Sequence, residues 1–559
     1  MECRLWAGPT RVSRIFSGTQ VGGIGGSGGR RERWFRLGAD GLPASARAAK
    51  CALCLLSRGW YVAASVELIA YASRLGGELG RLREILAGPL AGLFAGVHVL
   101  PFYVPFDGAD AGFDPQDHTK VDPRLGSWDD IAALARDGYT VMADLIVNHL
   151  SCTSPQFADW LAKGPQSAYD GMFLTFGSVF PQGARQEDLL RLYRPRPGLP
   201  FTAYTLADGS KRLVWTTFTP QQIDTDVGKQ VTRDYLLGVL DQFAAAGVSR
   251  VRLDAVGYAV KTPGLSCFMT PETFRFIREI TRWCHQRGLR VLVEVHSYYR
   301  RQIEIAHQVD QVYDFALPPL VLHALTTGDP QPLLAWMKLR PGNAVTVLDT
   351  HDGIGIIDAG ADGGDRSRPG LLTPAQADQL VTAIHRNSGG TSKLATGTAA
   401  SNVDLYQVNC TFYDALGAND QRYLLARALQ FWAPGTPQVY YAGLLAGRND
   451  MELLRQSGVG RDVNRHHYSA AEVNDELRRP VVQALLGLIR FRNSHPAFDG
   501  AFEISASGGH LQAAWTNGDQ AARLIARLDS GEGVLQWTTR TGDRQAALTD
   551  LAHHQFTFT

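Results

Sequence analysis

The sequence lacks an apolar run long enough to cross a bilayer, since no stretch approaches the roughly 18–20 residues that a membrane-spanning helix needs. Its first residues also lack the basic segment, apolar segment and small-residue cleavage site of a secretory signal. These absences predict a cytoplasmic protein with no membrane partner.

An excess of one charge is also absent. The 55 Lys and Arg residues balance 54 Asp and Glu residues, which leaves a formal net charge of +1. Proteins that bind nucleic acid through charge are usually strongly basic, so we expect no nucleic-acid partner. A content of 45% hydrophobic and 19% charged residues is typical of a globular protein.

Cysteine is scarce, odd in number and scattered. The seven cysteines are Cys3, Cys51, Cys54, Cys152, Cys267, Cys284 and Cys410. Most lie in apolar segments, which favours reduced thiols over a disulfide framework and agrees with a cytoplasmic location. The CxxC spacing at 51–54 has no βαβ context that would indicate a redox site.

Motifs for common cofactors are missing as well. No GxxxxGK[ST] loop is present, which argues against a nucleotide phosphate as a substrate that donates a group. No HExxH motif and no pair of CxxC motifs indicates zinc. We therefore expect neither a cofactor nor a metal.

Residues 1–64 differ from the rest of the chain. The segment 21–34 reads VGGIGGSGGRRERW, which is rich in Gly and Arg and has no hydrophobic periodicity. Such a segment can bury little apolar surface. We predict that residues 1–64 are disordered, or are an over-extended start, and exclude them from the fold.

From Val66 onward, short apolar runs alternate with amphipathic helical stretches such as 232–247 and 270–288. The eight runs lie at 66–71, 96–103, 140–149, 248–257, 290–296, 311–317, 344–352 and 436–443. Strand–helix alternation repeated eight times predicts an α/β fold, the (β/α)₈ TIM barrel.

Two of the spacings are too long for a simple βα unit. The surplus follows the third and the seventh strand, so both segments should lie over the carboxyl ends of the barrel strands. We predict a barrel formed by 65–149, 228–353 and 418–497, with insertion domains at 150–227 and 354–417. Short alternating runs in 498–559 predict a small antiparallel β domain at the C-terminus.

Three acidic residues each end an apolar run. Asp254 ends 248–254, Glu294 ends 290–294 and Asp352 ends 344–352. The carboxyl ends of barrel strands carry the catalytic groups of TIM-barrel enzymes. Paired carboxylates are typical of glycosyl transfer, in which one attacks and another moves a proton. The alternative is that each acid caps a helix or pairs with a nearby arginine.

Arg252 lies two residues before Asp254, so strand alternation directs both side chains to the same face. A guanidinium beside a carboxyl group lowers its pKa, and we expect Arg252 to keep Asp254 ionised as a nucleophile requires. A purely structural ion pair is the alternative. His149, His296 and His351 also fall at strand ends, which favours a functional position over a core one.

The runs DLIVNH, RVRLDAVG, VEVHS and LDTHD resemble, in order and spacing, the four signatures of the α-amylase-type retaining α-glucosidases, glycoside hydrolase family 13. Longer segments resemble the sucrose phosphorylase branch of that superfamily. Among them are FDGADAGFDPQDHTKVDPRLGSWDD (106–130), FTPQQIDTD (218–226) and ASNVDLYQVNCTFYDALG (400–417). The resemblance extends from about Val66 to Asp499.

The resemblance implies roles for individual residues. Asp254 would be the nucleophile, Glu294 the acid/base and Asp352 the transition-state stabiliser. The positions that bind the glucosyl ring would be Asp110, Phe113, His149, Arg252, His351 and Arg461. The acceptor side would comprise Tyr193, Arg196, Tyr258, His296, Asp404, Leu405, Tyr406 and Gln407, and Leu253 is added to the substrate-binding positions.

The resemblance further implies that sucrose and inorganic phosphate give α-D-glucose 1-phosphate and D-fructose with retention. Arg196 and Arg461 could offset the repulsion between phosphate and the carboxylates. The alternatives are a phosphorylase of sucrose 6′-phosphate, glucosylglycerol or glucosylglycerate, or an α-glucoside hydrolase or transglucosidase. A homodimer is compatible with the sequence. Relatives in the superfamily often hold calcium near the residue matching Asn148, but no complete ligand set is recognisable, so no metal is expected.

Overall fold

The structure is a computed structural model that describes residues 65–108, 110–194, 198–398, 407–540, 542–554 and 556. The prediction made for residues 1–64 lies outside the described residues.

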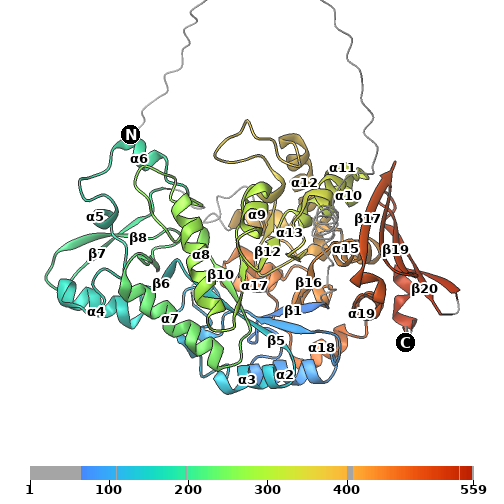
Figure 1. The fold of residues 1–559 in the computed structure, drawn as a ribbon, viewed down its shortest axis with the longest axis horizontal. Helices are drawn as coiled ribbons and strands as arrows, with labels where there is room; N and C mark the ends of the chain where they lie inside the picture. Colours follow the sequence, from blue (N-terminus) through green and yellow to red (C-terminus); the bar gives the residue numbers. More distant parts are fainter. Residues whose placement is uncertain are drawn as a thin grey trace, which may run out of the picture. The chain divides into compact units, whose positions relative to one another are not determined.

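Eight parallel strands form a closed barrel (Figure 1). They are β1 (Glu67–Ala70), β2 (Gly96–Val99), β5 (Thr140–Ile146), β10 (Arg250–Asp254), β11 (Arg290–Val293), β12 (Gln311–Asp314), β13 (Ala344–Thr346) and β16 (Thr436–Tyr440). Each pairs in parallel with the next barrel strand along the chain, and β16 closes the barrel on β1. The predicted TIM barrel and its eight strands are confirmed.

Strand β10 shows why such a run folds as a barrel strand. Val251 and Leu253 are fully buried and alternate with Arg250 and Arg252. Because side chains alternate along a strand, the two apolar residues face the helices and the charged ones face the barrel interior. Arg250 there donates both Nη atoms to Glu67 of β1, at 2.7 and 3.0 Å. The interior of this barrel is therefore partly polar.

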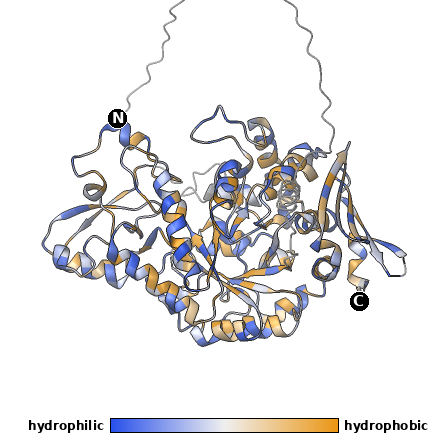
Figure 2. Ribbon diagram, in the orientation of Figure 1, coloured by the Kyte–Doolittle hydropathy of each residue, from blue (hydrophilic) through white to orange (hydrophobic). Residues whose placement is uncertain are grey.

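Helices surround the barrel. They are α2 (Leu79–Ala87), α3 (Trp128–Arg136), α7 (Gln230–Ala245), α8 (Pro271–His285), α9 (Tyr299–Ala306), α10 (Leu317–Thr327), α11 (Gln331–Leu339), α15 (Asp420–Trp432), α16 (Tyr441–Leu444), α17 (Met451–Ser457), α18 (Ala470–Glu476) and α19 (Pro480–Ser494). The helical stretches expected at 232–247 and 270–288 correspond to α7 and α8. Figure 2 shows mixed hydrophilic and hydrophobic colouring on the outer helices, as expected for helices that cover a barrel. No helix among the described residues has both the length and the apolar character to span a membrane.

Helix α8 illustrates how the sequence sets a helix boundary. The Thr270 hydroxyl accepts a hydrogen bond from the Thr273 amide at 3.3 Å, and Pro271 occupies the first helical position. Both features favour helix initiation. Phe276, Ile277 and Ile280 form its buried face.

Both long spacings hold additional elements at the carboxyl ends of the strands. After β5 come β6 (His149–Ser151), α4 (Pro155–Lys163), α5 (Phe176–Val179), α6 (Gln186–Leu190), β7 (Phe201–Thr205), β8 (Lys211–Trp215) and β9 (Gln222–Asp224). After β13 come β14 (Ile354–Gly355), α12 (Pro374–Asn387), α13 (Thr391–Thr398), β15 (Gln407–Val408) and α14 (Phe412–Ala415). The short strands β3 (Tyr103–Val104) and β4 (Asp117–Val121) form a ribbon after β2. The domain boundaries given above stay a prediction.

The C-terminal region is an antiparallel sheet of five strands, as predicted. It comprises β17 (Ala501–Ser507), β18 (His510–Asn517), β19 (Gln520–Arg527), β20 (Glu532–Thr539) and β21 (Gly542–Ala547). Trp515 of this sheet donates its indole N–H to the Trp432 carbonyl of α15 at 2.9 Å. Figure 1 places this sheet on the side of the barrel away from β7 and β8.

Candidate active site

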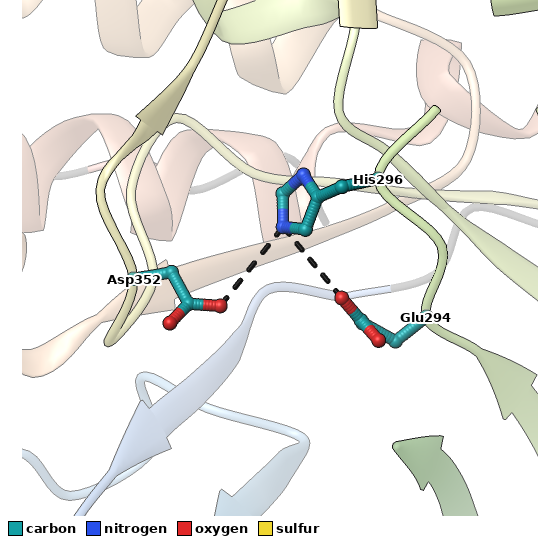
Figure 3. A group of neighbouring side chains, drawn as sticks. All are labelled: Glu294, His296 and Asp352. Carbon is teal, nitrogen blue, oxygen red and sulfur yellow. Dashed lines mark ion pairs between the residues drawn. The ribbon is translucent and has the colours of Figure 1, made fainter. Parts of the chain in front are cut away.

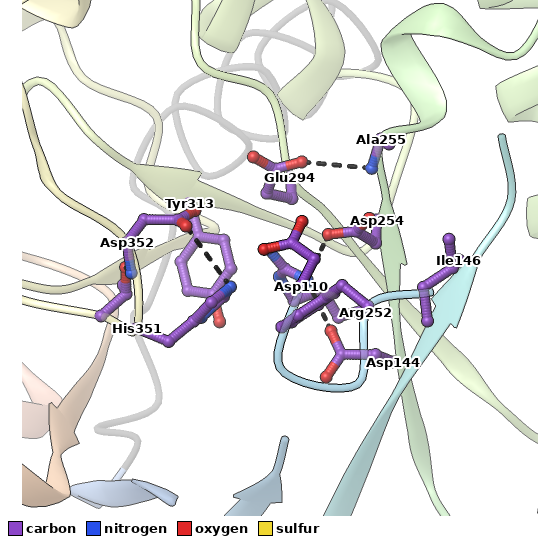
Figure 4. Close-up of polar contacts among 12 residues, drawn as sticks. Asp110, Asp144, Ile146, Arg252, Asp254, Ala255, Glu294, Tyr313, His351 and Asp352 are labelled. Atoms are coloured by element: carbon purple, nitrogen blue, oxygen red, sulfur yellow. Dashed lines mark hydrogen bonds and ion pairs between the residues drawn. The ribbon is translucent and has the colours of Figure 1, made fainter. Parts of the chain in front are cut away.

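A buried polar network lies at the end of β10 (Figure 4). Arg252 donates through Nη1 to Asp144 Oδ1 at 2.5 Å and to Asp254 Oδ1 at 2.8 Å. The second oxygen of Asp144 lies 2.9 Å from His98 Nε2. A single guanidinium therefore serves two carboxyl groups, one of which ends the strand at the mouth of the barrel.

The pKa of Asp254 is shifted by opposing effects. Burial raises its pKa well above the usual range, Arg252 opposes this effect, and the neighbouring Glu294, Asp144 and Asp352 raise the pKa further. Arg252 therefore lowers the pKa of Asp254, as predicted, but burial and the neighbouring carboxyl groups outweigh this contribution. The physical reason is that Arg252 is shared with Asp144, while Asp254 is desolvated among other carboxylates. That Asp254 is ionised when it reacts stays a prediction.

Glu294 directly follows β11 and is hydrogen-bonded to the backbone of the two residues that flank Asp254. Its amide donates to the Leu253 carbonyl at 3.3 Å, and its Oε2 accepts from the Ala255 amide at 3.3 Å. Ala255 has a φ of 52°, in the left-handed region, which for a residue with a Cβ costs about 1–2 kcal/mol. This strained conformation directs the N–H that follows Asp254 at the Glu294 carboxylate.

Asp352 lies across the cavity and is held by cations. Arg461 Nη1 is 2.9 Å from Asp352 Oδ1 and 3.7 Å from Asp110 Oδ1. Burial alone would raise the pKa of Asp352, but Arg461, His351 and His296 together lower it far below its usual range. Asp352 is therefore an anion, suited to oppose positive charge that develops in front of it.

Aromatic rings shape the wall near Asp352. The Phe113 and His351 rings stack with centroids 4.4 Å apart and planes 10° apart, and Tyr71 meets His351 edge-on at 6.1 Å. Burial lowers the pKa of His351 to about 3, so this imidazole is neutral at physiological pH. The resulting surface combines apolar faces with polar edges, as a sugar ring requires.

The antiparallel pair β6 and β9 supplies a second polar wall. His149 Nε2 lies 2.8 Å from the Phe113 carbonyl oxygen and 3.1 Å from Gln222 Nε2. The Gln222 amide also donates to Asp110 Oδ2 at 3.4 Å. Gln222 therefore joins His149 to Asp110, a link that sequence reasoning missed although the quoted segment 218–226 contains this residue.

The opposite rim is aromatic. The Tyr193 and Tyr258 rings are stacked at 6.2 Å, and Phe268 packs against both, at 4.8 and 4.6 Å. Phe218 contacts Tyr258 edge-on at 5.2 Å. These rings come from the first insertion and from the loop after β10, so the rim is assembled from segments distant in sequence.

His296 projects between Glu294 and Asp352 (Figure 3). Its Nε2 is 3.7 Å from Glu294 Oε1 and 3.9 Å from Asp352 Oδ2, while its Nδ1 lies 2.9 Å from Asp358 Oδ2. Carboxylate and imidazole groups in this geometry could hold a metal ion. The same groups fit proton transfer and anion contact equally well, and no other such group occurs in the described part of the chain.

An ammonium group occupies the oxygen cluster around Asn148. Lys261 Nζ is 2.7 Å from Asp224 Oδ2 and 2.9 Å from Asn148 Oδ1, and it also donates to the Tyr258 carbonyl. The Lys261 side chain is only 1% exposed. The Lys261 ammonium thus balances the charge of Asp224 and contacts Asn148, the residue near which relatives in the superfamily often hold calcium.

Most of the predicted site residues meet at one cavity. Those that line it are Asp110, Phe113, His149, Tyr193, Asp254, Tyr258, Glu294, His296, His351, Asp352, Gln407 and Arg461. Arg252 lies behind Asp254, and Leu253 is fully buried and does not line the cavity. Arg196, Asp404, Leu405 and Tyr406 lie outside the described residues. The lining residues that were not predicted are Phe218, Gln222, Ala255, Gly257, Phe268, Val295 and Ile357.

Known proteins resemble this chain in sequence and in structure. The family model "Alpha amylase, catalytic domain" matches residues 92–315. The chain is 57% identical to a sucrose phosphorylase of Agrobacterium vitis, over 84% of this chain and 96% of the relative. It is 55% identical to a sucrose phosphorylase of Bifidobacterium adolescentis, over 86% and 97%. A crystal structure of sucrose 6F-phosphate phosphorylase from Thermoanaerobacter thermosaccharolyticum is similar, with a TM-score of 0.79, 34% identity, and coverage of 87% of this chain and 99% of the other.

Proposed function

The chain belongs to the sucrose phosphorylase family, a branch of the α-amylase-type retaining glycosidases, and we propose that it converts sucrose and inorganic phosphate into α-D-glucose 1-phosphate and D-fructose. The observation that carries this proposal is the identity of 57% and 55% to two sucrose phosphorylases over nearly their whole length. The meeting of Asp254, Glu294 and Asp352 at one cavity supports it independently.

In the first half-reaction, Asp254 attacks the anomeric carbon of the glucosyl ring. Glu294 donates a proton to the glycosidic oxygen, so fructose leaves as a neutral alcohol and a β-glucosyl ester forms on Asp254. Asp254 must be ionised when it attacks, whereas Glu294 must be protonated. The Ala255 amide directly follows Asp254 in the chain and donates a hydrogen bond to Glu294, so it fixes the position of the two carboxyl groups relative to each other.

In the second half-reaction, a phosphate oxygen attacks the same carbon from the face that fructose left. Glu294 accepts the proton of the attacking phosphate, and the Asp254 carboxylate is released. Two inversions give net retention. Asp352, kept anionic by Arg461, would stabilise the positive charge at the anomeric carbon in both transition states.

Substrate contacts are part of the same proposal. The glucosyl ring would be bound by Asp110, Phe113, His149, Arg252, His351 and Arg461, with Gln222 added on the basis of its position between His149 and Asp110. Fructose and phosphate would alternate in the space bounded by Tyr193, Arg196, Tyr258, His296, Asp404, Leu405, Tyr406 and Gln407. Arg461 also donates to Gln407 Oε1 at 3.2 Å, which joins the two halves of the site.

Related substrates are the alternatives. Identity to the two sucrose phosphorylases named above, 57% and 55%, is well above the 34% identity to the sucrose 6F-phosphate phosphorylase structure, which favours sucrose. The test is release of glucose 1-phosphate from sucrose, sucrose 6′-phosphate, glucosylglycerol and glucosylglycerate at equal concentration. Faster release of glucose 1-phosphate from one of the other three glucosides would show that this glucoside, and not sucrose, is the substrate. Free glucose as the main product in excess phosphate would indicate a hydrolase.

The assignment of the two catalytic carboxylates has a separate test. Glu294→Gln should react very slowly with sucrose but should still accept α-glucosyl fluoride, because fluoride leaves without a proton. Mass spectrometry after digestion should then find a glucosyl adduct on the peptide containing Asp254. An adduct on any other peptide contradicts the assignment.

Location and assembly complete the proposal. We expect a cytoplasmic enzyme, since the four described cysteines, Cys152, Cys267, Cys284 and Cys410, form no disulfide. Fractionation of cells would test this. Light scattering would show a homodimer as twice the chain mass of 61.0 kDa.

A further inference from the structure

A buried carboxylate outside the cavity contacts the histidine that projects into it. Asp358 belongs to the short 3-10 helix Ile357–Ala359 in the second insertion and is fully buried. Its Oδ2 lies 2.9 Å from His296 Nδ1. Its Oδ1 accepts hydrogen bonds from the Ser297 amide at 2.9 Å and from Gln302 Nε2 at 3.3 Å. Asp358 thus joins the second insertion to the loop after β11.

The packing fixes the position of this pair. A Cβ at Gly355 would lie 2.3 Å from Asp358 Oδ2 and 3.2 Å from His296 Nδ1, so no larger residue fits there without displacing them. On the other side, Phe315, which directly follows β12, stacks on the imidazole with centroids 3.9 Å apart and planes 14° apart. The ring can therefore neither rotate nor withdraw without losing these contacts.

The pair with Asp358 determines what His296 presents to the cavity. Since Nδ1 donates to a carboxylate, Nε2 faces the cavity, 3.7 Å from Glu294 Oε1 and 3.9 Å from Asp352 Oδ2. It has no hydrogen-bond partner among the described residues. A neutral ring would direct a lone pair at two carboxylates, whereas a protonated ring directs an N–H at them.

The charges around the ring favour the protonated form. Burial would lower the pKa of His296, but Asp358, through its charge and hydrogen bond, and then Glu294 and Asp352 raise it to about 9. Arg461, which lines the same cavity, is paired with Asp352. At neutral pH His296 therefore carries a positive charge on the acceptor side of the cavity.

We propose that Asp358 is a positioning residue that holds His296 as an imidazolium, whose Nε2–H donates to a phosphate oxygen during attack on the glucosyl-enzyme. This inference rests on the proposed function. Phosphate must approach Glu294 and Asp352, both of which repel it, and the charge of Arg461 is already balanced by Asp352. The imidazolium supplies a donor and a positive charge at that point. Water carries no charge, so hydrolysis of the glucosyl-enzyme gains far less from it.

The test compares Asp358→Asn with Asp365→Asn, a matched control in the same insertion whose side chain is exposed and contacts Ser367. Asparagine keeps the size of the side chain but removes the charge. The KM for phosphate should rise about tenfold in Asp358→Asn, the typical loss of a charge-assisted contact. The rate at which α-glucosyl fluoride loads the enzyme should stay within about twofold, because fluoride needs no donor on the acceptor side. Asp365→Asn should match the wild type in both.

Two further readouts separate positioning from packing. NMR titration of the His296 Cε1–H signal, assigned with His296→Gln, should give a pKa near 9 in the wild type, lowered by about one to three pH units in Asp358→Asn. Between about pH 8 and 10, where phosphate remains a dianion, the ratio of glucose 1-phosphate to glucose should fall with pH in the wild type. Gly355→Ala, which leaves the charge but displaces the pair, should show the same phosphate defect.

The outcomes distinguish this inference from the proposed function. An unchanged KM for phosphate in Asp358→Asn, or an equal loss of loading and phosphorolysis, would overturn it. So would a His296 titration that does not respond to the substitution. A wild-type enzyme that forms no glucose 1-phosphate would refute the proposed function, whereas the NMR titration would still decide whether Asp358 holds the charge on His296.

Discussion

Replacing Lys261 with methionine should destabilise the protein and alter the donor side of the cavity. The ammonium is almost fully buried and contacts Asp224, Asn148 and the Tyr258 carbonyl. Methionine fills a similar volume but leaves the Asp224 carboxylate buried without its cation. The residue looks like an ordinary loop lysine in the sequence, so the size of its effect is a direct test of the structure.

The magnitude follows from the burial of the pair. Removing one partner of a buried ion pair typically costs about 3–5 kcal/mol, because the remaining charge is uncompensated. For about 500 folded residues, the entropy of unfolding is about 1 kcal/mol/K, so this loss lowers Tm by about 3–5 °C. Lys211→Met, at an exposed position of β8 in the first insertion, should leave Tm within about 1 °C.

The effect on activity should appear mainly at the glucosyl subsite. Asp224 lies opposite His149 in the backbone register of β6 and β9. Its carboxylate oxygens accept hydrogen bonds from the Thr217 amide at 2.9 Å and from the Thr217 hydroxyl at 2.5 Å. An unpaired Asp224 will shift this ribbon and with it His149 and Gln222. We therefore expect a higher KM for sucrose in Lys261→Met, with a smaller change in the KM for phosphate.

A double variant and a chelator complete the test. Lys261→Met combined with Asp224→Asn removes both charges and should recover part of the lost stability. Because an ammonium already occupies these oxygens, EDTA should leave the Tm and activity of the wild type unchanged. A single variant as stable as the Lys211→Met control, or a wild type that loses stability in EDTA, would refute the reasoning.

Four other predictions test the site and the chain ends. Asp254→Asn should abolish turnover of both sucrose and α-glucosyl fluoride while Tm changes little, since an amide cannot form the ester; residual glucosylation would contradict this. Because the pKa of Asp254 is raised and attack needs its ionised form, the single-turnover rate of glucosylation should fall as pH drops through a value above the usual Asp range; a rate that is flat down to about pH 4 would argue against it. Removing residues 1–60 should leave activity and Tm nearly unchanged, as a Gly- and Arg-rich segment buries little apolar surface; a loss of several degrees would show that it docks. Arg196→Ala should weaken phosphorolysis by about 2 kcal/mol, so the ratio of glucose to glucose 1-phosphate should rise about tenfold or more, and an unchanged ratio would make Arg196 a bystander.

The barrel and the positions of three carboxyl groups at its mouth could be predicted because both depend on local sequence. A parallel strand buried on both faces needs a continuous apolar run, and such runs are visible along the chain. A residue that ends such a run must lie at the mouth of the barrel. Asp254, Glu294 and Asp352 each satisfy this condition, and the structure brings all three to one cavity.

Residues that act through distant partners could not be found in this way. Asp358 follows a two-residue strand, and Lys261 lies in a loop; in both cases the side chains they contact are 37 or more residues away in sequence. Gln222 ends up beside His149 only because β6 and β9 pair. No periodic sequence pattern marks such positions, because the role of each side chain depends on its tertiary contacts.

The protonation of Asp254 depends on a balance that no local pattern contains. One cavity is lined by four acidic residues, Asp110, Asp254, Glu294 and Asp352. The two arginines that pair with them, Arg252 and Arg461, are each shared between two carboxyl groups. A hydrolase can work with this balance, because water brings no charge to the site. A phosphorylase must also admit a dianion, so it needs a positive charge on the acceptor side that the carboxylates do not already neutralise. Since the three acids are common to both reactions, the choice between phosphate and water must depend on residues supplied by the loops, such as His296 with Asp358.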